Sequence, residues 1–360
     1  MTGSVWQIQL RSPSGTKVLL QAGLSCQDCH THCYDLVNMH SSVVAPDTVT
    51  GIQVEQSPPS SNRRVIIALS ACSLLLLMFC VLAAPPGILK SAQPLIITVL
   101  ALSGPLLVPA ALFHDRKKWA HRDSSLMLPW TLLIACLIVQ AAPITATFAF
   151  PLRDGLWRSL DQHLGIDVPA IMAFTSRHPA LNSLLSRSYA FTLHPLVLCA
   201  IFLPTLLGKR EAAQRFVLCN AFSFVLALPL MIFLPAIGPW VGWGITPDKL
   251  QKACEATIYA LRHGSLDIHD NFGGIVCLPS FHAFWAIISA QALYGFRYLR
   301  YPAIAIACLI TISTVTTGWH YGVDVIAGLL MVVICTILSN SVMYGRVKFA
   351  PRTKSGSSPQ

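Results

Sequence analysis

Eight long apolar segments dominate this sequence and restrict it to very few folds. A helix needs about 20 mainly apolar residues to cross the hydrocarbon core of a bilayer. Only helices and closed barrels satisfy their backbone polar groups there. The apolar segments are 65–84, 94–113, 127–149, 189–208, 216–236, 281–298, 301–318 and 322–343. We therefore predict an all-α fold, a polytopic membrane helix bundle with about eight spans.

The overall composition supports lipid rather than water as the main solvent. Hydrophobic residues make up 54% of the chain and charged residues 11%, whereas a soluble domain carries about a quarter charged residues. The net charge is +10, but a nucleic-acid-binding protein needs a solvated basic face. Here the basic residues stand in short runs between apolar segments. We expect the phospholipid bilayer as a partner and no nucleic acid.

The distribution of basic residues predicts how the chain is oriented. Fifteen Lys and Arg residues fall on one side of the predicted membrane and eight on the other. The richer side includes Arg63, the run Arg116–Lys118 and the segment 346–360. Cytoplasmic loops carry the excess of Lys and Arg, so both termini are predicted to be cytoplasmic. We expect an integral protein of a bacterial inner (cell) membrane.

The segments outside the apolar spans divide the chain further. Residues 1–62 are polar and are expected to form a disordered cytoplasmic tail, and 63–150 hold three transmembrane helices. Cys26, Cys29 and Cys33 form a compact group in the tail, which is either a zinc knuckle or a tail without function, because a second paired half is missing. The loop 150–188 contains an amphipathic pattern that is either an interfacial helix or a plain linker.

Two short segments carry residues typical of catalysis. One is Leu278-Pro279-Ser280-Phe281-His282, at the start of the sixth predicted span, and the other runs from Thr317 to Asp324, between the last two. The sixth span leads inward from His282, and the seventh leads back outward to His320. This hairpin should bring both histidines to one membrane face, the extracytoplasmic one.

The residue types in these segments suit phosphoryl transfer. His320 and Asp324 are four positions apart and would share a helix face, so that Asp324 can accept the Nδ1 proton and leave Nε2 of His320 free to attack. His282 can protonate the leaving oxygen. Ser280 and the backbone amides around Phe281, at a helix N-terminus, can bind phosphate oxygens. Taken singly, each feature also fits a capped helix end or an interfacial histidine.

These residues resemble the type 2 phosphatidic acid phosphatase superfamily, in the branch of the inositol-phosphorylceramide synthases (inositolphosphotransferases) and their bacterial relatives. The resemblance covers roughly 155–345 and makes 151–345 the expected catalytic domain. It implies a six-helix core, a phosphohistidine intermediate on His320, His282 as acid and base, and Asp324 as the orienting residue. Further matching pieces are Leu164-Gly165-Ile166-Asp167, Tyr189, His194-Pro195, the run 234–239, Leu261-Arg262 and Val325-Ile326-Ala327-Gly328.

The chain departs from the superfamily pattern in its phosphate-binding cations. Nothing matches the first motif, a Lys followed by a distant Arg-Pro. Ser313 and Thr314 stand where the third motif has Ser-Arg. A phosphoryl transition state needs cations or many donors, and Arg262 is the candidate substitute, although it could equally be a solvated loop arginine. His263 and Lys252 are weaker options.

Three functions remain open from the sequence. The first choice is a lipid-phosphate phosphatase, a hydrolase that transfers the phosphoryl group to water without a metal or another cofactor. The second is a phosphotransferase with an alcohol acceptor, and the third is a lipid-binding or transport protein that has lost catalysis. The acids in the external loops do not pair with the histidines at metal-ligand spacing. The lipid, the acceptor and the oligomeric state are not fixed by the sequence.

Overall fold

The computed structural model describes residues 5–11, 17–23, 60–85, 126–264 and 276–345. The chain divides into two units, Met1–Gln56 and Ser57–Gln360. The Cys26, Cys29 and Cys33 group and the predicted span 94–113 lie outside the described residues.

The first unit contains a β-hairpin. Strand β1 (Val5–Arg11) pairs antiparallel with β2 (Lys17–Gly23), in a register that runs from Val5 opposite Gly23 to Arg11 opposite Lys17. Apolar and polar residues alternate along β1, which is the period of a strand with two unlike faces. These strands lie in the segment that we expected to be a disordered cytoplasmic tail, and that expectation stays a prediction. The all-α description applies to the second unit.

Four long helices of the second unit are apolar enough to cross a membrane. They are α1 (Ser60–Ala83), α4 (Met127–Thr147), α9 (Arg210–Phe233) and α14 (Gly322–Tyr344). A fifth candidate is a bent pair, in which α7 (Pro179–Phe191) and α8 (Leu193–Leu206) meet at 45°. Several spans confirm an integral membrane protein, while the number of eight stays a prediction.

Two apolar helices are shorter than the spans predicted for them. Helix α12 (Phe281–Leu293) ends before the predicted limit of 298, and α13 covers Arg300–Thr316. A helix rises about 1.5 Å per residue, so the 13 residues of α12 extend over roughly 20 Å. The histidine-bearing hairpin is therefore compact, with its turn between residues 294 and 299.

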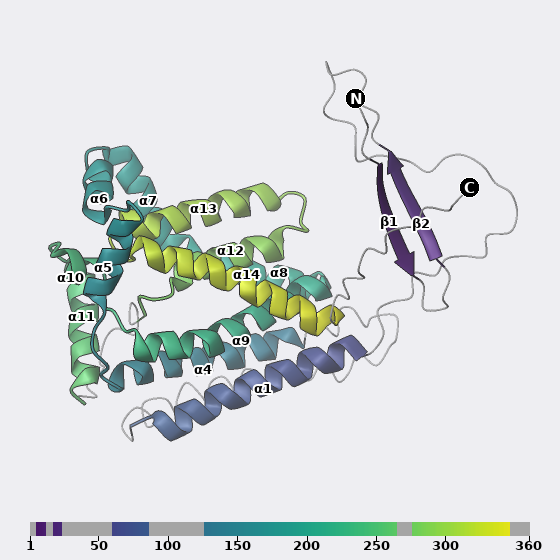
Figure 1. Cartoon of the computed structure of the whole chain (residues 1–360), viewed down its shortest axis with the longest axis horizontal. Coiled ribbons are helices and arrows are strands. Elements are labelled where there is room, and N and C mark those ends of the chain that lie inside the picture. Colours follow the sequence, from purple (N-terminus) through teal and green to yellow (C-terminus); the bar gives the residue numbers. More distant parts are fainter. Residues whose placement is uncertain (1–4, 12–16, 24–59, 86–125, 265–275, 346–360) are drawn as a thin grey trace, which may run out of the picture. The chain divides into compact units, whose positions relative to one another are not determined.

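The spanning helices pack into one bundle around a continuous apolar core. Helices α1, α4 and α9 lie side by side, and α12 contacts α8, α9, α13 and α14. In Figure 1 these helices run in nearly the same direction. Buried residues from several helices, such as Leu69, Phe224, Ile288 and Cys335, belong to a single cluster. This core fixes the relative positions of the helix ends that carry the histidines.

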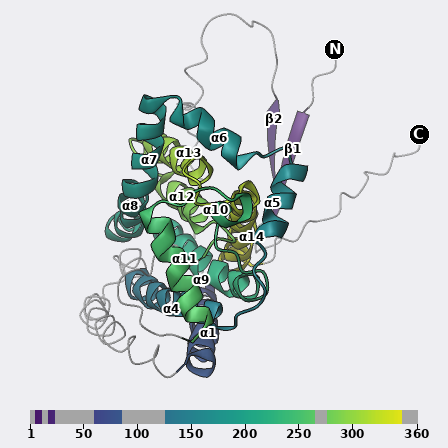
Figure 2. The same ribbon diagram turned by 90° about the vertical axis from the view of Figure 1, so that its left-hand side faces the viewer.

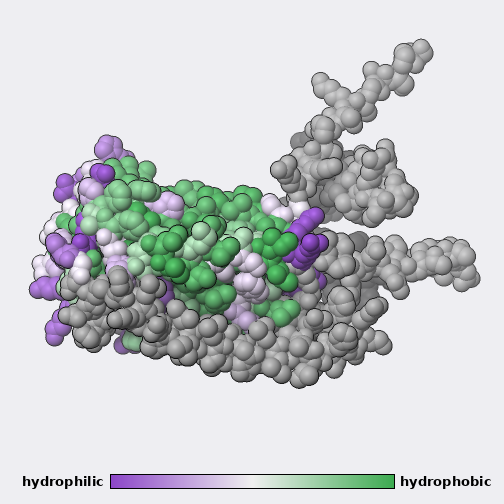
Figure 3. Space-filling model, turned by 90° about the horizontal axis from the view of Figure 1, so that it is seen from below, coloured by the Kyte–Doolittle hydropathy of each residue, from purple (hydrophilic) through white to green (hydrophobic). Residues whose placement is uncertain are grey.

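The outer surface of the bundle is apolar as well. On α14, Leu330, Val333 and Ile337 are more than half exposed. Figure 3 shows a hydrophobic middle band on the described helical unit, with hydrophilic residues at both ends. Hydrocarbon, unlike water, places no penalty on such a surface. This arrangement supports a protein that is surrounded by lipid along its middle.

Four short helices cover one end of the bundle, as the end-on view of Figure 2 shows. They are α5 (Asp154–His163), α6 (Val168–Ser176), α10 (Pro239–Trp243) and α11 (Lys249–Arg262). Local sequence explains where two of these helices start. Asp167 caps α6 by accepting the Ala170 amide, and Asp248 and Gln251 form a capping box at α11. These helices surround the ends of α12, α13 and α14.

Candidate functional site

Helices α12, α13 and α14 bring the two predicted histidines to the same end of the bundle (Figure 1). His282 is the second residue of α12, and His320 lies in the turn between α13 and α14. The centroids of the two imidazole rings are 5.7 Å apart, and the ring planes are inclined by 60°. The hairpin geometry predicted from the sequence is therefore present in the fold.

The turn that holds His320 is fixed by the end of α13. The Thr314 carbonyl accepts the backbone amides of both Trp319 and His320, at 3.2 and 3.1 Å. Gly318 has a φ of 73°, a left-handed conformation that a residue with a Cβ rarely adopts. The chain consequently reverses over a few residues and delivers His320 beside the first turn of α14.

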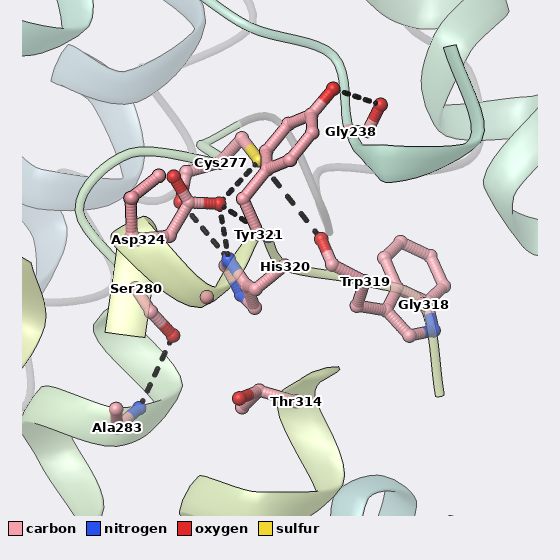
Figure 4. Close-up of polar contacts among 12 residues, drawn as sticks. Gly238, Cys277, Ser280, Ala283, Thr314, Gly318, Trp319, His320, Tyr321 and Asp324 are labelled. Carbon is pink, nitrogen blue, oxygen red and sulfur yellow. Dashed lines mark hydrogen bonds and ion pairs between the residues drawn. The ribbon is translucent and has the colours of Figure 1, made fainter. Parts of the chain in front are cut away.

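The ring of His320 is held through its Nδ1 atom (Figure 4). Nδ1 lies 3.0 Å from the carbonyl oxygen of Cys277 and 3.5 Å from Oδ2 of Asp324. Both neighbours are acceptors, so this nitrogen carries the proton and Nε2 has a free lone pair. The predicted contact with Asp324 is present as the longer of the two, and the carbonyl of Cys277 is a partner that the sequence did not reveal.

Asp324 is itself held by a backbone amide and a thiol. Its Oδ2 accepts the amide of Tyr321 at 2.9 Å and the Sγ of Cys277 at 3.0 Å. Burial and the charge of Asp324 raise the pKa of the Cys277 thiol well above its ordinary value, so Cys277 stays protonated and donates. Oδ1 of Asp324 is buried without a partner among the described residues.

Ser280 and Phe281 have structural contacts in the described protein. Ser280 caps α12 by accepting the Ala283 amide at 3.4 Å, and its own amide donates to the Asp324 carbonyl at 3.0 Å. Phe281 stacks on Phe224 in the core, at 4.3 Å between centroids. Their predicted phosphate binding is untested, and the Phe281 side chain points into the core, so only its backbone amide could serve.

A close contact between α14 and the start of α12 joins the two histidine-bearing segments. A Cβ on Gly328 would lie 2.6 Å from the Ser280 carbonyl oxygen. Only glycine permits so short a separation of backbone from helix. The position is buried, because Gly328 is among the buried residues of α14.

Helix α5 contributes two buried aspartates that the sequence analysis did not select. Asp161 accepts the amides of Gly322 and Val323, at 2.9 and 2.8 Å, at the N-terminus of α14. Helix N-termini favour a carboxylate because their amides are unpaired. Burial raises the pKa of Asp161, against the effect of the two amides. Asp161 thus binds the first turn of the helix that carries Asp324.

Asp154 anchors the same region from the other end of α5. Its carboxylate accepts the amides of Ile237 and Gly238 and the hydroxyl of Tyr321, all at 3.0 to 3.2 Å. Tyr321 follows His320 directly and is fully buried. Burial raises the pKa of Asp154 too, although its hydrogen bonds oppose the shift. The amphipathic helix expected in this loop exists, and its inward face holds Asp154, Trp157 and Asp161.

A cavity of about 740 Å³ opens beside His282. Tyr189 stacks on His282 at 4.5 Å and lies 5.9 Å from Trp319, and all three line the cavity. His320 is 3% exposed and is not among the residues that line this cavity. The described lining includes His194 and polar residues of α6, α7 and α11, but no Lys or Arg.

The structure does not bring Arg262 to this cavity. Arg262 donates to the carbonyls of Ala149 and Phe150, at 3.3 and 2.8 Å, beside the end of α4. Its predicted role in phosphate binding gains no support from this position. The Cys277 thiol donates to Asp324 and forms no disulfide with another described cysteine.

One group of possible metal ligands coincides with the candidate site. Donor atoms of Cys277, His320 and Asp324 lie within 4.8 Å of one another. Cys, His and carboxylate ligands are typical of zinc. Hydrogen bonds among the same three residues account for their closeness, so the geometry by itself does not require an ion.

A protein-family model matches residues 156–338, just over half of the chain, and is described as the PAP2 superfamily. The chain belongs to the PAP2 superfamily. No curated protein and no solved structure matches it. PAP2 superfamily members are phosphoesterases and phosphotransferases, so membership supports an enzyme of this general kind. The matched region runs from the third residue of α5 through most of α14 and contains both histidines and Asp324, while α1 and α4 lie outside it.

Some residues of this PAP2 site carried a signal in the sequence. Asp154, Trp157 and Asp161 are spaced three and four apart, which places them on one helix face. Two acids on the buried face of a surface helix indicate partners among backbone amides. The contacts of Cys277 through its carbonyl had no such signal, because any residue type offers a carbonyl.

Proposed function

We propose that the protein is an integral membrane phosphatase that hydrolyses lipid phosphate esters through a phosphohistidine on His320. One observation carries the proposal: His282 and His320 lie 5.7 Å apart, and the Nδ1 side of His320 is occupied by Cys277 and Asp324. Nε2 of His320 is thereby the nucleophilic atom. Superfamily membership supports this general activity.

In the first step Nε2 of His320 attacks the phosphorus atom. A nitrogen–phosphorus bond forms while the ester phosphorus–oxygen bond breaks, and the bonding electron pair leaves with the alcohol oxygen. The phosphate dianion bound beside His282 favours the charged imidazole, and the protonated His282 then gives a proton to that oxygen. Cys277 and Asp324 stabilise the positive charge that develops on the His320 ring. The products are a free lipid alcohol and phosphohistidine.

In the second step water resolves the intermediate. The now neutral His282 takes a proton from the attacking water, a new phosphorus–oxygen bond forms, and the nitrogen–phosphorus bond breaks with its electron pair returning to Nε2. His282 ends protonated and His320 ends with a free Nε2, so the cycle closes. No step uses a metal ion, and we assign none to this site.

The substrate class follows from the surroundings of the site. The cavity at His282 lies at one end of an apolar bundle, where a phosphate head group meets the membrane surface. We place this end on the extracytoplasmic side, in keeping with the basic residues predicted on the cytoplasmic side. A reporter fused to the C-terminus tests this orientation, and an external signal would reverse it.

The decisive experiment traps the intermediate. Purified full-length protein is mixed with ³²P-labelled phosphatidic acid and quenched in alkali, where phosphohistidine survives and is afterwards lost in acid. Labelled protein is expected from the wild type and none from His320→Ala. His178→Ala, at the exposed N-cap of α7, is the matched control. Full phosphate release by His320→Ala would refute the assignment.

A second candidate is a phosphotransferase of the inositol-phosphorylceramide synthase type. The cavity of about 740 Å³ exceeds what phosphate and water need, and Asn182, Ser186 and Asp248 offer polar groups to an acceptor alcohol. The same two steps apply with an alcohol in place of water. Incubation with a lipid phosphate and a panel of alcohols distinguishes the phosphatase from the phosphotransferase. A transferase forms a new phosphomonoester or phosphodiester of the alcohol instead of free phosphate.

A third candidate, a lipid-binding or transport protein without catalysis, is favoured by the absence of Lys and Arg from the described lining of the cavity. Binding of phosphatidic acid without turnover by the wild type, and without phosphoprotein in the trapping experiment, would support it over both enzymes.

A further inference from the structure

A second cavity lies deeper in the bundle and shares one residue with the cavity at His282. It has a volume of about 330 Å³ and is formed by α4, α8, α9 and α12. His194, near the start of α8, lines both cavities. His282 and Trp285 are three residues apart on α12 and therefore lie on one face, about 4.5 Å apart along its axis. His282 lines the first cavity and Trp285 the second.

The wall of this second cavity offers almost no free polar groups. Trp285 donates its Nε1 to Asn220 at 2.9 Å, Asn220 donates to the Phe216 carbonyl at 2.8 Å, and Thr131 donates to the Met127 carbonyl at 2.8 Å. Apart from His194 and Phe216, the other lining residues are aliphatic, among them Ala135 and Leu198. Such a cavity does not hold water well. A hydrocarbon chain can fill it, because such a chain needs no hydrogen-bond partners.

We infer that this cavity binds a hydrocarbon tail of the substrate while the phosphate lies at His282, with His194 at the junction. The inference rests on the proposed function and adds the place where the hydrocarbon chain of the lipid phosphate binds. One wall comes from α4, which lies outside the matched region 156–338. Helix α4, which precedes the superfamily region, thus takes part in substrate selection.

The occupant is argued from volume and continuity. A volume of about 330 Å³ admits one chain rather than a bulky ring system or two chains. Along α4 the cavity extends from Thr131 to Val139, roughly 12 Å at the rise of a helix. It also leads away from the end that carries His320. A chain in this position would point toward the centre of the bilayer, as the rest of the lipid does.

The test compares chain lengths in variants that fill the cavity. Ala135→Trp on α4 and Leu198→Trp on α8 place an indole in the proposed tail site from two different helices. Val333→Trp, on the exposed face of α14, is the matched control. Phosphate release is measured with butyl phosphate and dodecyl phosphate for full-length protein in a bilayer nanodisc, and the ratio of the two KM values is compared among the variants.

In the wild type, dodecyl phosphate is expected to have the lower KM, since each buried methylene favours binding. In both cavity variants the KM for butyl phosphate divided by the KM for dodecyl phosphate should fall roughly tenfold. The added indole would displace a few methylenes of the longer chain from the tail site. Val333→Trp should keep the wild-type ratio. An unchanged ratio in both cavity variants, or an equal change in Val333→Trp, would overturn the inference.

A binding experiment separates this inference from the proposed function. If the wild type releases no phosphate at all, catalysis fails but the tail site can still be tested. Dodecyl phosphate with a photoreactive diazirine at its chain end is crosslinked to the His320→Ala protein, and labelled peptides are mapped. Label on α4 or α8 that dodecyl phosphate displaces and dodecanol does not supports the tail site. Equal displacement by both compounds, or label elsewhere, contradicts it.

Discussion

Asp161 on the short helix α5 accepts the backbone amide of Gly322 at 2.9 Å, across 161 positions of the chain. It also accepts the next amide of α14. The contact ties a surface helix to the turn in which His320 and Asp324 lie. Asp161 is fully buried, and its carboxylate binds backbone amides rather than an imidazole. We therefore regard it as a positioning residue.

Replacing Asp161 should lower turnover more than substrate binding. In Asp161→Ala we expect kcat to fall roughly tenfold with KM little changed, because the nucleophile is misplaced while the cavity remains. Asp161→Asn keeps one acceptor oxygen and should retain part of the activity. Asp167→Ala, which removes the cap of α6, is the control for general loss of helix stability. Equal loss of kcat in the control would contradict a specific role for Asp161.

The two buried aspartates also predict how stability changes with pH. Burial raises the pKa of Asp154 and Asp161. Between the ordinary aspartate pKa and these raised values the folded protein binds more protons than the unfolded one, so stability falls as pH rises through that window and is level above it. The thermal unfolding temperature in detergent should fall as pH rises through this window. In Asp161→Asn the unfolding temperature should depend less on pH. A wild type that gains stability through this window would show that the amides outweigh burial.

The role of His282 as an acid predicts a dependence on the leaving group. His282→Ala should lose about 10² to 10³ in kcat with an alkyl phosphate, whose leaving alkoxide needs a proton. With p-nitrophenyl phosphate, whose leaving group is stable without a proton, the loss should be much smaller. His320→Ala should lose activity with both substrates. An equal loss in His282→Ala with both substrates would argue against proton transfer by this residue.

The thiol of Cys277 is predicted to matter as a hydrogen-bond donor. Cys277→Ser can still donate to Asp324 and should keep most of the activity, whereas Cys277→Ala removes the donor and should lower kcat by about tenfold. Because Cys277 is 4% exposed, maleimide should inactivate the native protein slowly. Similar kcat values for the two variants would show that the Sγ contact has no catalytic consequence.

Metal independence is tested with chelators. Cys277, His320 and Asp324 have the residue types of a zinc site, but the mechanism requires Nδ1 of His320 to keep its proton. Phosphate release should be unchanged after dialysis against EDTA. Loss of activity that zinc restores would replace the proposed mechanism by a metal-dependent one.

The sequence predicted those parts of the site that depend on periodicity and on a hairpin. His282, His320 and Asp324 meet because two apolar helices return to the same end, and apolar segments are visible without a structure. The expectation that Asp324 alone orients His320 was incomplete, since the nearer acceptor on Nδ1 is the Cys277 carbonyl. Backbone groups carry no residue signature, so sequence patterns do not reveal them.

The sequence also did not reveal which distant parts of the chain single side chains would contact. Arg262 was a reasonable candidate cation, yet it binds carbonyls at the end of α4, more than a hundred positions away. Asp154 and Asp161 were not selected from the sequence. Their burial depends on how α5 packs against α10 and α14, which composition and spacing do not determine.

The contact between Gly328 and the Ser280 carbonyl oxygen has a consequence for how this protein can vary over evolution. Even an added methyl group would force α14 away from the start of α12, and His320 and His282 would separate with those backbones. Position 328 should therefore tolerate no other amino acid in any active descendant, although it never meets a substrate.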